Sequence, residues 1–292
     1  MRVCRCGYFP SGADEKLTWQ VVRFFAVPII LVLAGGTPSV CRAYLMDAFD
    51  ARVADYGTLE IEVQPAGYFL VDSEGLQHYL VAPSIILYLG FAERLDLVVA
   101  SRGFLLLNEV EGLQAYHSRE SAVSLRWLLL EGAYNDGEGP SLAIQTGVLL
   151  PNFGVDPTQS VGAQVGALFA QTTDMGTVHV NQWISRTAWE SWDLFVPVAY
   201  EGPGDWPVRP LVEVWLDYDT HPELGGTLLS LLLGAYVDLS ETLTVGAGVR
   251  HANWSGEYSE LEVRLSLWWQ LPIWESEPSV SDDTLAARLF PG

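Results

Sequence analysis

Polar and apolar residues alternate strictly along several stretches of the chain. The clearest stretch is TLEIEVQ at residues 58–64, and ELEVRLSLWW at 260–269 repeats the pattern. Successive side chains of a strand point to opposite faces, so this alternation predicts strands with one apolar and one polar face. Similar alternation marks VHVNQWIS, VEVWLDYD and LTVGAGVR, at residues 178–185, 212–219 and 243–250. The pattern therefore predicts an all-β protein.

Turn-rich gaps divide residues 57–272 into twelve strand segments. Many of them run for about nine or more residues, near the ~9–11 that a tilted membrane strand needs and above the ~5–6 of an average strand. We expect them to begin near Gly57, Gln77, Leu95, Ala122, Ser141, Val161, Thr177, Trp192, Arg209, Leu228, Leu243 and Tyr258. Their polar faces often carry small residues, as in GAQVGALFAQT, which suits a crowded barrel interior. We predict an antiparallel transmembrane β-barrel of about twelve strands rather than a soluble sandwich; ten and fourteen strands stay open.

An even strand number places both ends of a bacterial barrel in the periplasm. The turns GFAERL, YNDGEG, TTDMG, GPGDWP and DLSET are accordingly expected in the periplasm. The gaps VDSEG, NEVEGLQAYHSRE, NFGVDPTQ, RTAWES, THPELGG and NWSGE are expected outside the cell.

Composition supports a membrane barrel. Hydrophobic residues make up 49% of the chain and charged residues only 17%, with 11 Trp and 12 Tyr. After residue 43 no apolar run approaches the ~18 residues of a spanning helix, so the apolar residues are spread over alternate positions. The expected location is the bacterial outer membrane, with membrane lipid and the barrel-assembly machinery as partners.

The first 43 residues resemble a secretion signal in pattern. The apolar stretch at 24–36 is shorter than a membrane span, and cleavage is expected after Ala43, with an uncleaved anchor as the alternative. The stretch before it is long and carries Asp14 and Glu15, which suggests a start codon assigned too far upstream. A lead-in at 44–56, the barrel at 57–272 and an acidic tail at 273–292 would follow.

Charge and cysteine content exclude several classes of function. All three cysteines precede residue 43, so the mature chain would offer no disulfide or thiol chemistry. That chain would hold 10 basic and 34 acidic residues, a formal charge of −24, which argues against nucleic-acid partners. The five histidines lack metal-ligand spacing, and neither Ser255 nor the glycine motifs have the context of a catalytic or nucleotide site. We expect no enzyme activity, cofactor or metal.

Polar residues on the inward faces are the candidates for lining the barrel and for selectivity. They are Glu60, Glu62, Arg102, Arg126, His179, Asn181, Glu213, Asp217, Arg250, Glu260, Glu262 and Arg264. Closure of the barrel makes the first and last strands neighbours, which predicts one acidic cluster of Glu60, Glu62, Glu260 and Glu262 around Arg264. The cluster is either a cation-favouring lining or gate, or a structural plug bridged by arginine, and the filled interiors of small barrels favour the plug.

The stretch LGFAERLDLVV, with Glu93 and Arg94 in its middle, has an echo in YVDLSETLTV later in the chain. The alignment matches Tyr88 with Tyr236. Both stretches predict the end of one strand, a tight periplasmic turn and the start of the next strand. The tyrosine rings are expected in the interfacial belt.

Several stretches resemble the outer-membrane family labelled "MetA-pathway of phenol degradation", whose members are described as transporters. They are YLGFAERLDLVV, SLRWLLLEG with GPSLAIQTGVLLP, and GAYVDLSETLTVGAGVR. The resemblance covers most of residues 50–271, and the chain departs from it by the tail after Trp269. It implies passive transport of a small apolar or aromatic solute. The alternative is a closed structural or adhesion barrel: inward Trp183, Trp215 and Trp268 favour a filled interior, whereas inward Gly162, Gly166, Gly246 and Gly248 favour open space.

Overall fold

The computed structural model describes residue 48 and residues 50–73, 76–81, 83–106, 116–133, 139–151, 160–186, 191–220, 226–254 and 258–273. The predicted signal, its cysteines and the tail from residue 274 lie outside these residues. The strands are β1 Thr58–Ser73, β2 Leu76–Val81, β3 Ser84–Ala92, β4 Leu95–Leu106, β5 Tyr116–Leu130, β6 Ser141–Leu149, β7 Gly162–Thr173, β8 Gly176–Arg186, β9 Trp192–Glu201, β10 Arg209–Asp219, β11 Gly226–Ser240, β12 Leu243–Trp254 and β13 Tyr258–Pro272. Within the described part of the chain, no helix has the length and apolar character to span a membrane.

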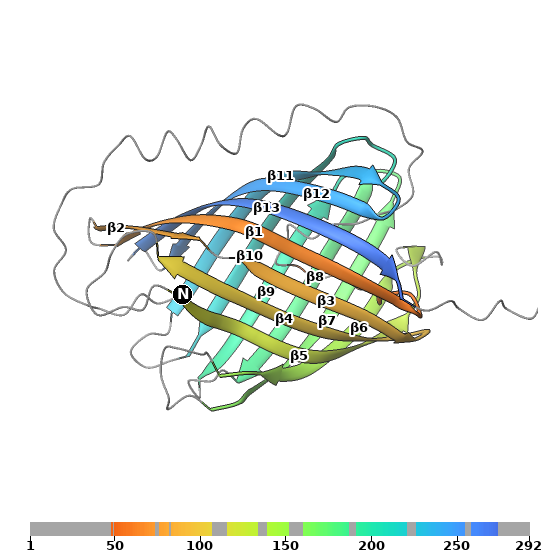
Figure 1. The fold of residues 1–292 in the computed structure, drawn as a ribbon, viewed down its shortest axis with the longest axis horizontal. Coiled ribbons are helices and arrows are strands. Elements are labelled where there is room, and N and C mark those ends of the chain that lie inside the picture. The colour runs from red at the N-terminus through yellow and green to blue at the C-terminus, as the bar shows by residue number, and fades with distance from the viewer. Residues whose placement is uncertain are drawn as a thin grey trace, which may run out of the picture.

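The sheet closes into a barrel because β13 pairs antiparallel with β1 along the whole of both strands. β2 and β3 together fill one place in the wall, since both lie between β1 and β4. Pro83, just before β3, has no backbone N–H to donate to the ladder at this interruption. The barrel therefore has twelve strand positions, which confirms the predicted fold class (Figure 1).

Six strands start at the predicted residue, and most others start within one or two residues of it. The largest difference is β5, which begins at Tyr116 and not at Ala122. Its first residues read YHSRES and show no apolar alternation, so the sequence gives no sign of a strand there. Backbone pairing of β5 with β4 extends the sheet beyond the alternating part, from Ala100↔Ala122 to Leu105↔Tyr116.

The outward face of the wall is apolar, as the alternation predicted. Along β8 every second residue from Thr177 to Ser185 is buried, and the residues between them are exposed. Exposed apolar residues continue this outward face around the barrel: Ile144, Val165, Val180, Ile184, Val198, Val214, Leu216, Leu231, Leu233, Val249 and Val263. A closed wall that shows hydrocarbon outside and polar groups inside is the arrangement of a membrane barrel.

Large aromatic residues mark the two edges of the apolar band. Trp127, Tyr200 and Trp269 are exposed near the end with the short turns, and Trp192 and Tyr218 are exposed near the opposite end. Amphipathic rings of this kind form the girdles of transmembrane barrels at the two membrane interfaces.

The two repeated stretches form hairpins of the same design, as predicted. Glu93 and Arg94 make a two-residue turn between β3 and β4, and Glu241 and Thr242 make one between β11 and β12. In each hairpin the register shifts by one residue just before the turn. The repeat therefore specifies a bulge followed by a tight turn at the same end of the barrel.

Candidate functional site in the barrel interior

The chain that precedes β1 runs through the inside of the barrel. We call residues 48 and 50–54 the interior segment. Ala48, Asp50, Ala51 and Ala54 are each no more than 1% exposed. The sequence suggested only a lead-in at 44–56, so this occupation of the interior was not predicted.

One side of the interior segment is fixed by a buried arginine. Arg126 forms ion pairs with Asp50, at 3.2 Å, and with Asp96. The backbone N–H of Ala54 donates a hydrogen bond of 2.9 Å to Asp96. The guanidinium also stacks over the ring of Tyr88, 4.9 Å from its centroid. One cation from β5 thus joins the interior segment to β3 and β4.

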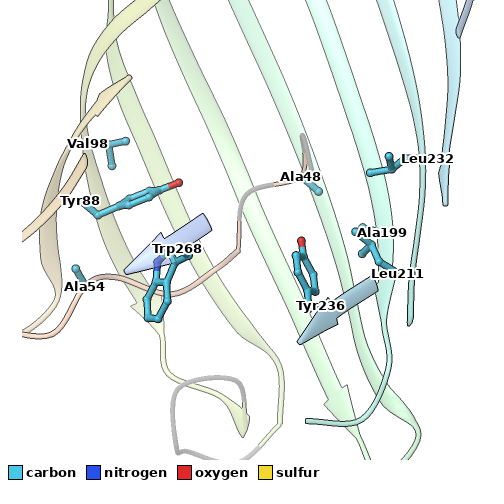
Figure 2. Close-up of a cluster of buried hydrophobic side chains, with 9 residues drawn as sticks. All are labelled: Ala48, Ala54, Tyr88, Val98, Ala199, Leu211, Leu232, Tyr236 and Trp268. Atoms are coloured by element: carbon cyan, nitrogen blue, oxygen red, sulfur yellow. The ribbon is translucent and has the colours of Figure 1, made fainter. Parts of the chain in front are cut away.

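The other end of the interior segment reaches the opposite wall. The backbone N–H of Ala48 donates a 2.8 Å hydrogen bond to Glu213 on β10, 165 residues further along the chain. Figure 2 shows Ala54 on the side of Tyr88, and Ala48 on the side of Tyr236. Since the segment touches both sides, it crosses the interior instead of following one wall.

Apolar packing holds the middle of the interior segment. Ala51 and Val53 belong to a buried cluster whose other members come from β5 to β8: Leu128, Ala143, Leu168, Ala170 and Trp183. Arg52 lies beside it and forms a 2.9 Å ion pair with Glu60 on β1. The segment therefore has both charged and apolar contacts with the wall, but no residue from 48 to 54 that the structure describes belongs to a strand.

Gly90 on β3 makes room for the interior segment. A Cβ atom at this position would lie 2.0 Å from the carbonyl oxygen of Asp55 and 2.4 Å from that of Ala54. The backbone N–H of Gly57 donates a 2.8 Å hydrogen bond to the Gly90 carbonyl. Close backbone approach, and not an unusual dihedral angle, explains this glycine.

The predicted acidic cluster is divided along the seam between β1 and β13. Glu60 and Glu62 lie opposite Gln270 and Trp268, whereas Glu260 and Glu262 lie opposite Val71 and Phe69. The four carboxylates therefore do not form one compact group, but Arg264 pairs with Glu262 at 2.8 Å and also interacts electrostatically with Glu62. The first and last strands are neighbours as predicted, but their carboxylates sit at different levels of the barrel.

Each of these carboxylates has a partner. Glu262 forms ion pairs with Arg250, at 2.7 Å, and with Arg264, at 2.8 Å. Arg250 also lies 3.7 Å from Glu260. Glu62 accepts a 3.2 Å hydrogen bond from Gln64, and its Coulombic interactions are with Arg102 and Arg264. Pairing of this kind fits the plug interpretation better than an unneutralised cation lining.

A third ion-pair network lies at the short-turn end. Arg209 on β10 contacts Glu201 and Asp238, at 2.8 Å each. Asp238 also accepts a 2.6 Å hydrogen bond from the hydroxyl of Thr244. His179 lies 3.8 Å from Glu201. Of this network, only His179 was among the predicted candidates.

The tyrosines of the repeat do not lie in the interfacial belt as predicted. Tyr88 is 1% exposed and Tyr236 is fully buried, and both point into the barrel. Each ring lies beneath an arginine, Arg126 over Tyr88 and Arg209 over Tyr236. Each tyrosine lies on the inward face of its strand, where a buried cation covers it.

The remaining candidates lie apart from these networks. Asn181 is fully buried on β8, and neither atom of its amide has a hydrogen-bond partner in the described structure. Asp217 lies near Asp193 towards the long-loop end of β9 and β10. No group of three or more His, Cys, Asp and Glu residues suited to a metal ion occurs within the described ranges.

Two of the four inward glycines, Gly166 and Gly246, do not open space in the interior, because neighbouring side chains fill it. A Cβ atom on Gly166 would lie 2.5 Å from the Trp183 ring, and one on Gly246 would lie 2.9 Å from the Tyr236 ring. Trp183, Trp215 and Trp268 are themselves at most 6% exposed. Small and large residues are therefore complementary, and glycines accommodate the rings of neighbouring strands.

Comparison of the fold identifies similar solved structures. The chain matches the COG4313 outer membrane channel from Pseudomonas putida F1 with a TM-score of 0.56 and 9% identity, covering 77% of this chain and 100% of that one. The translocator domain of the autotransporter NalP from Neisseria meningitidis matches with a TM-score of 0.44 and 11% identity, covering 74% of this chain and 89% of that one. The KdgM porin matches with a TM-score of 0.44 and 9% identity, covering 72% of this chain and 98% of that one. No protein-family model and no curated protein matches the sequence.

The likeness to the COG4313 channel supports the fold. The chain is an antiparallel barrel of the outer-membrane type, and the first match spans that protein's whole length. At 9% identity the match does not transfer an activity.

Proposed function

We propose that the barrel mediates passive transport of a small solute and that the interior segment closes the pathway until it is displaced. The observation that carries this proposal is the way in which the segment is held. It is anchored by side chains such as Asp50 and Arg52 and not by strand pairing, so it can leave without opening the wall. The resemblance in fold to an outer membrane channel supports the same function.

The solute that the interior suits has a substantial apolar part. Displacement of Ala51 and Val53 would uncover an apolar patch that includes Leu128, Leu168 and Trp183. This agrees with the apolar or aromatic solutes implied by the resemblance to the phenol-degradation family. The proposed process is diffusion down a gradient, with no catalytic step.

The test compares single-channel conductance and liposome swelling for the native chain and for a variant with Asp50→Asn and Arg52→Gln. The double substitution removes the pairs with Arg126 and Glu60, so conductance and solute entry are expected to rise. Arg94→Gln is the matched control, because it removes a 3.0 Å ion pair with Glu131 on the exposed surface. If both the native chain and the double variant fold as barrels and neither passes ions or solutes, transport is refuted.

The second candidate is a closed structural or adhesion barrel. Its supporting observation is the tight packing of Trp183 over Gly166 and of Tyr236 over Gly246. On this hypothesis, loss of the Asp50 and Arg52 pairs lowers stability without creating conductance. Single-channel conductance and liposome swelling of the double variant therefore separate a transport barrel from a closed structural barrel.

A further inference from the structure

One glutamine on the lipid-facing surface of the barrel, Gln182, lies in an apolar setting. Gln182 lies on the exposed row of β8, between Val180 and Ile184. Its neighbour across the strand pair is Ala167 on β7, also on the outward face. None of these three neighbours carries a polar side chain.

Gln182 lies near the middle of the membrane. It is the seventh residue of β8, counted from the short-turn end. Six steps of about 3.3 Å along a strand tilted by about 40° raise it by roughly 15 Å, in an apolar band about 25 Å tall. Its side chain is too short to reach either interface from this depth.

Its amide finds no partner in its own wall. No hydrogen bond joins the Gln182 side chain to any residue that the structure describes. Two other outward polar groups behave differently: Thr146 donates to the Gln164 carbonyl at 3.3 Å, and Gln171 donates to the Thr172 carbonyl at 3.1 Å. An amide in hydrocarbon without a hydrogen bond carries a substantial cost in free energy.

We propose that the outward face of β6 to β8 is a dimer interface, on which a second copy of this chain pairs its Gln182 with Gln182 of the first. A primary amide offers both donors and an acceptor, so it is complementary to itself, whereas lipid tails offer neither. A two-fold axis beside residue 182 forms two amide–amide hydrogen bonds at once. The small Ala167 allows the two walls to approach closely at this point.

The face around Gln182 is apolar. Exposed apolar side chains extend on both sides of Gln182 over β6 to β8: Ile144, Val148, Val165, Val180 and Ile184. They provide the packing area, and the amide pair fixes the register of the two copies.

Cysteine cross-linking in the outer membrane tests the geometry. The full chain carries Gln182→Cys, with Cys4, Cys6 and Cys41 replaced by serine, and is treated with a membrane-permeant oxidant. A disulfide-linked species of twice the monomer mass is expected. Val249→Cys is the matched control, because Val249 is also exposed and is the seventh residue of its strand, on another side of the barrel.

A second measurement follows the association of purified protein. Gln182→Leu is expected to raise the dimer dissociation constant roughly tenfold, which corresponds to about 1.4 kcal/mol. Gln182→Asn keeps an amide and is expected to retain part of the association. Heat-modifiable migration on a gel shows that each variant is folded. Conductance of the Gln182→Leu variant tests transport independently of dimer formation.

Four results would overturn the dimer proposal. Gln182→Cys stays monomeric after oxidation, or it forms a disulfide to a different protein. Alternatively, Val249→Cys cross-links equally well, or Gln182→Leu leaves the association unchanged.

Discussion

Substitution of Gly90 by alanine should displace the interior segment while leaving the wall of the barrel in place. The added methyl group would point inward from β3 and lie 2.0 Å from the carbonyl oxygen of Asp55. The β3 strand is held by long ladders on both sides, whereas the backbone at residues 54–55 belongs to no strand. The segment is therefore the part that moves.

The size of the effect follows from the contacts. Contacts below 3.0 Å essentially do not occur for a Cβ atom, so the backbone at Asp55 must shift by at least 1.0 Å. Overpacking of this kind costs about 1–3 kcal/mol, and loss of the hydrogen bond from Ala54 to Asp96 adds to it. A combined cost of about 3 kcal/mol changes the ratio of open to closed barrels roughly a hundredfold.

Conductance in planar bilayers and labelling of an Ala51→Cys reporter measure this shift. Ala51 is fully buried, so labelling by a polar maleimide reports its release. Gly204→Ala is the control, because a Cβ atom there would have no neighbour within 4 Å. Unchanged labelling would refute the packing argument, and increased labelling with unchanged conductance would refute the role of the segment as a plug.

Three further substitutions test the energetics of two interior sites and one surface ion pair. Arg126→Leu leaves the buried carboxylate of Asp50 without its cation and should destabilise the closed barrel by about 3–5 kcal/mol. On a gel, the fast-migrating folded band should therefore disappear at a lower temperature. Gly166→Ala pushes a methyl group against Trp183 and should lower that temperature by an amount equivalent to about 1–3 kcal/mol, with relief by the additional change Trp183→Leu. Arg94→Gln removes a half-exposed ion pair, so its effect on stability should be at most about 1 kcal/mol.

The wall could be predicted from the sequence because its signals are local. Alternation with a period of two marks each strand, and a turn of two residues follows from the short polar gap at Glu93 and Arg94. The prediction failed where the local signal is missing. The first residues of β5 are polar on both faces, and only the ladder with β4 makes them a strand.

The site was only partly predictable because its contacts join distant parts of the chain. Glu213 was identified as an inward residue from the alternation of β10, but its partner Ala48 lies 165 residues away. Asp50 and Arg52 precede the first alternating stretch and have no periodic pattern. Asp96 was accessible to sequence reasoning, since it is a single carboxylate on the inward face of an apolar strand.

The repeat is more informative in the structure than in the sequence. Both copies place a tyrosine inside the barrel under an arginine from another strand, with Arg126 at 4.9 Å from the Tyr88 centroid and Arg209 at 5.7 Å from that of Tyr236. A turn and an interfacial anchor would need no such arginine. The two hairpins therefore carry equivalent positions for holding a buried cation at the short-turn end.

The two copies differ at the position that decides whether the interior segment can dock. Asp238 in the second hairpin aligns with Gly90 in the first and pairs with Arg209 at 2.8 Å. Gly90 has no side chain, and the space beside it is taken by the backbone at residues 54–55. Asp50 of the interior segment then supplies a carboxylate to Arg126. Both carboxylates of Arg209, Glu201 and Asp238, come from the wall. Arg126 has one carboxylate from the wall, Asp96, and receives the second from Asp50, which makes the segment a removable part of the charge pairing.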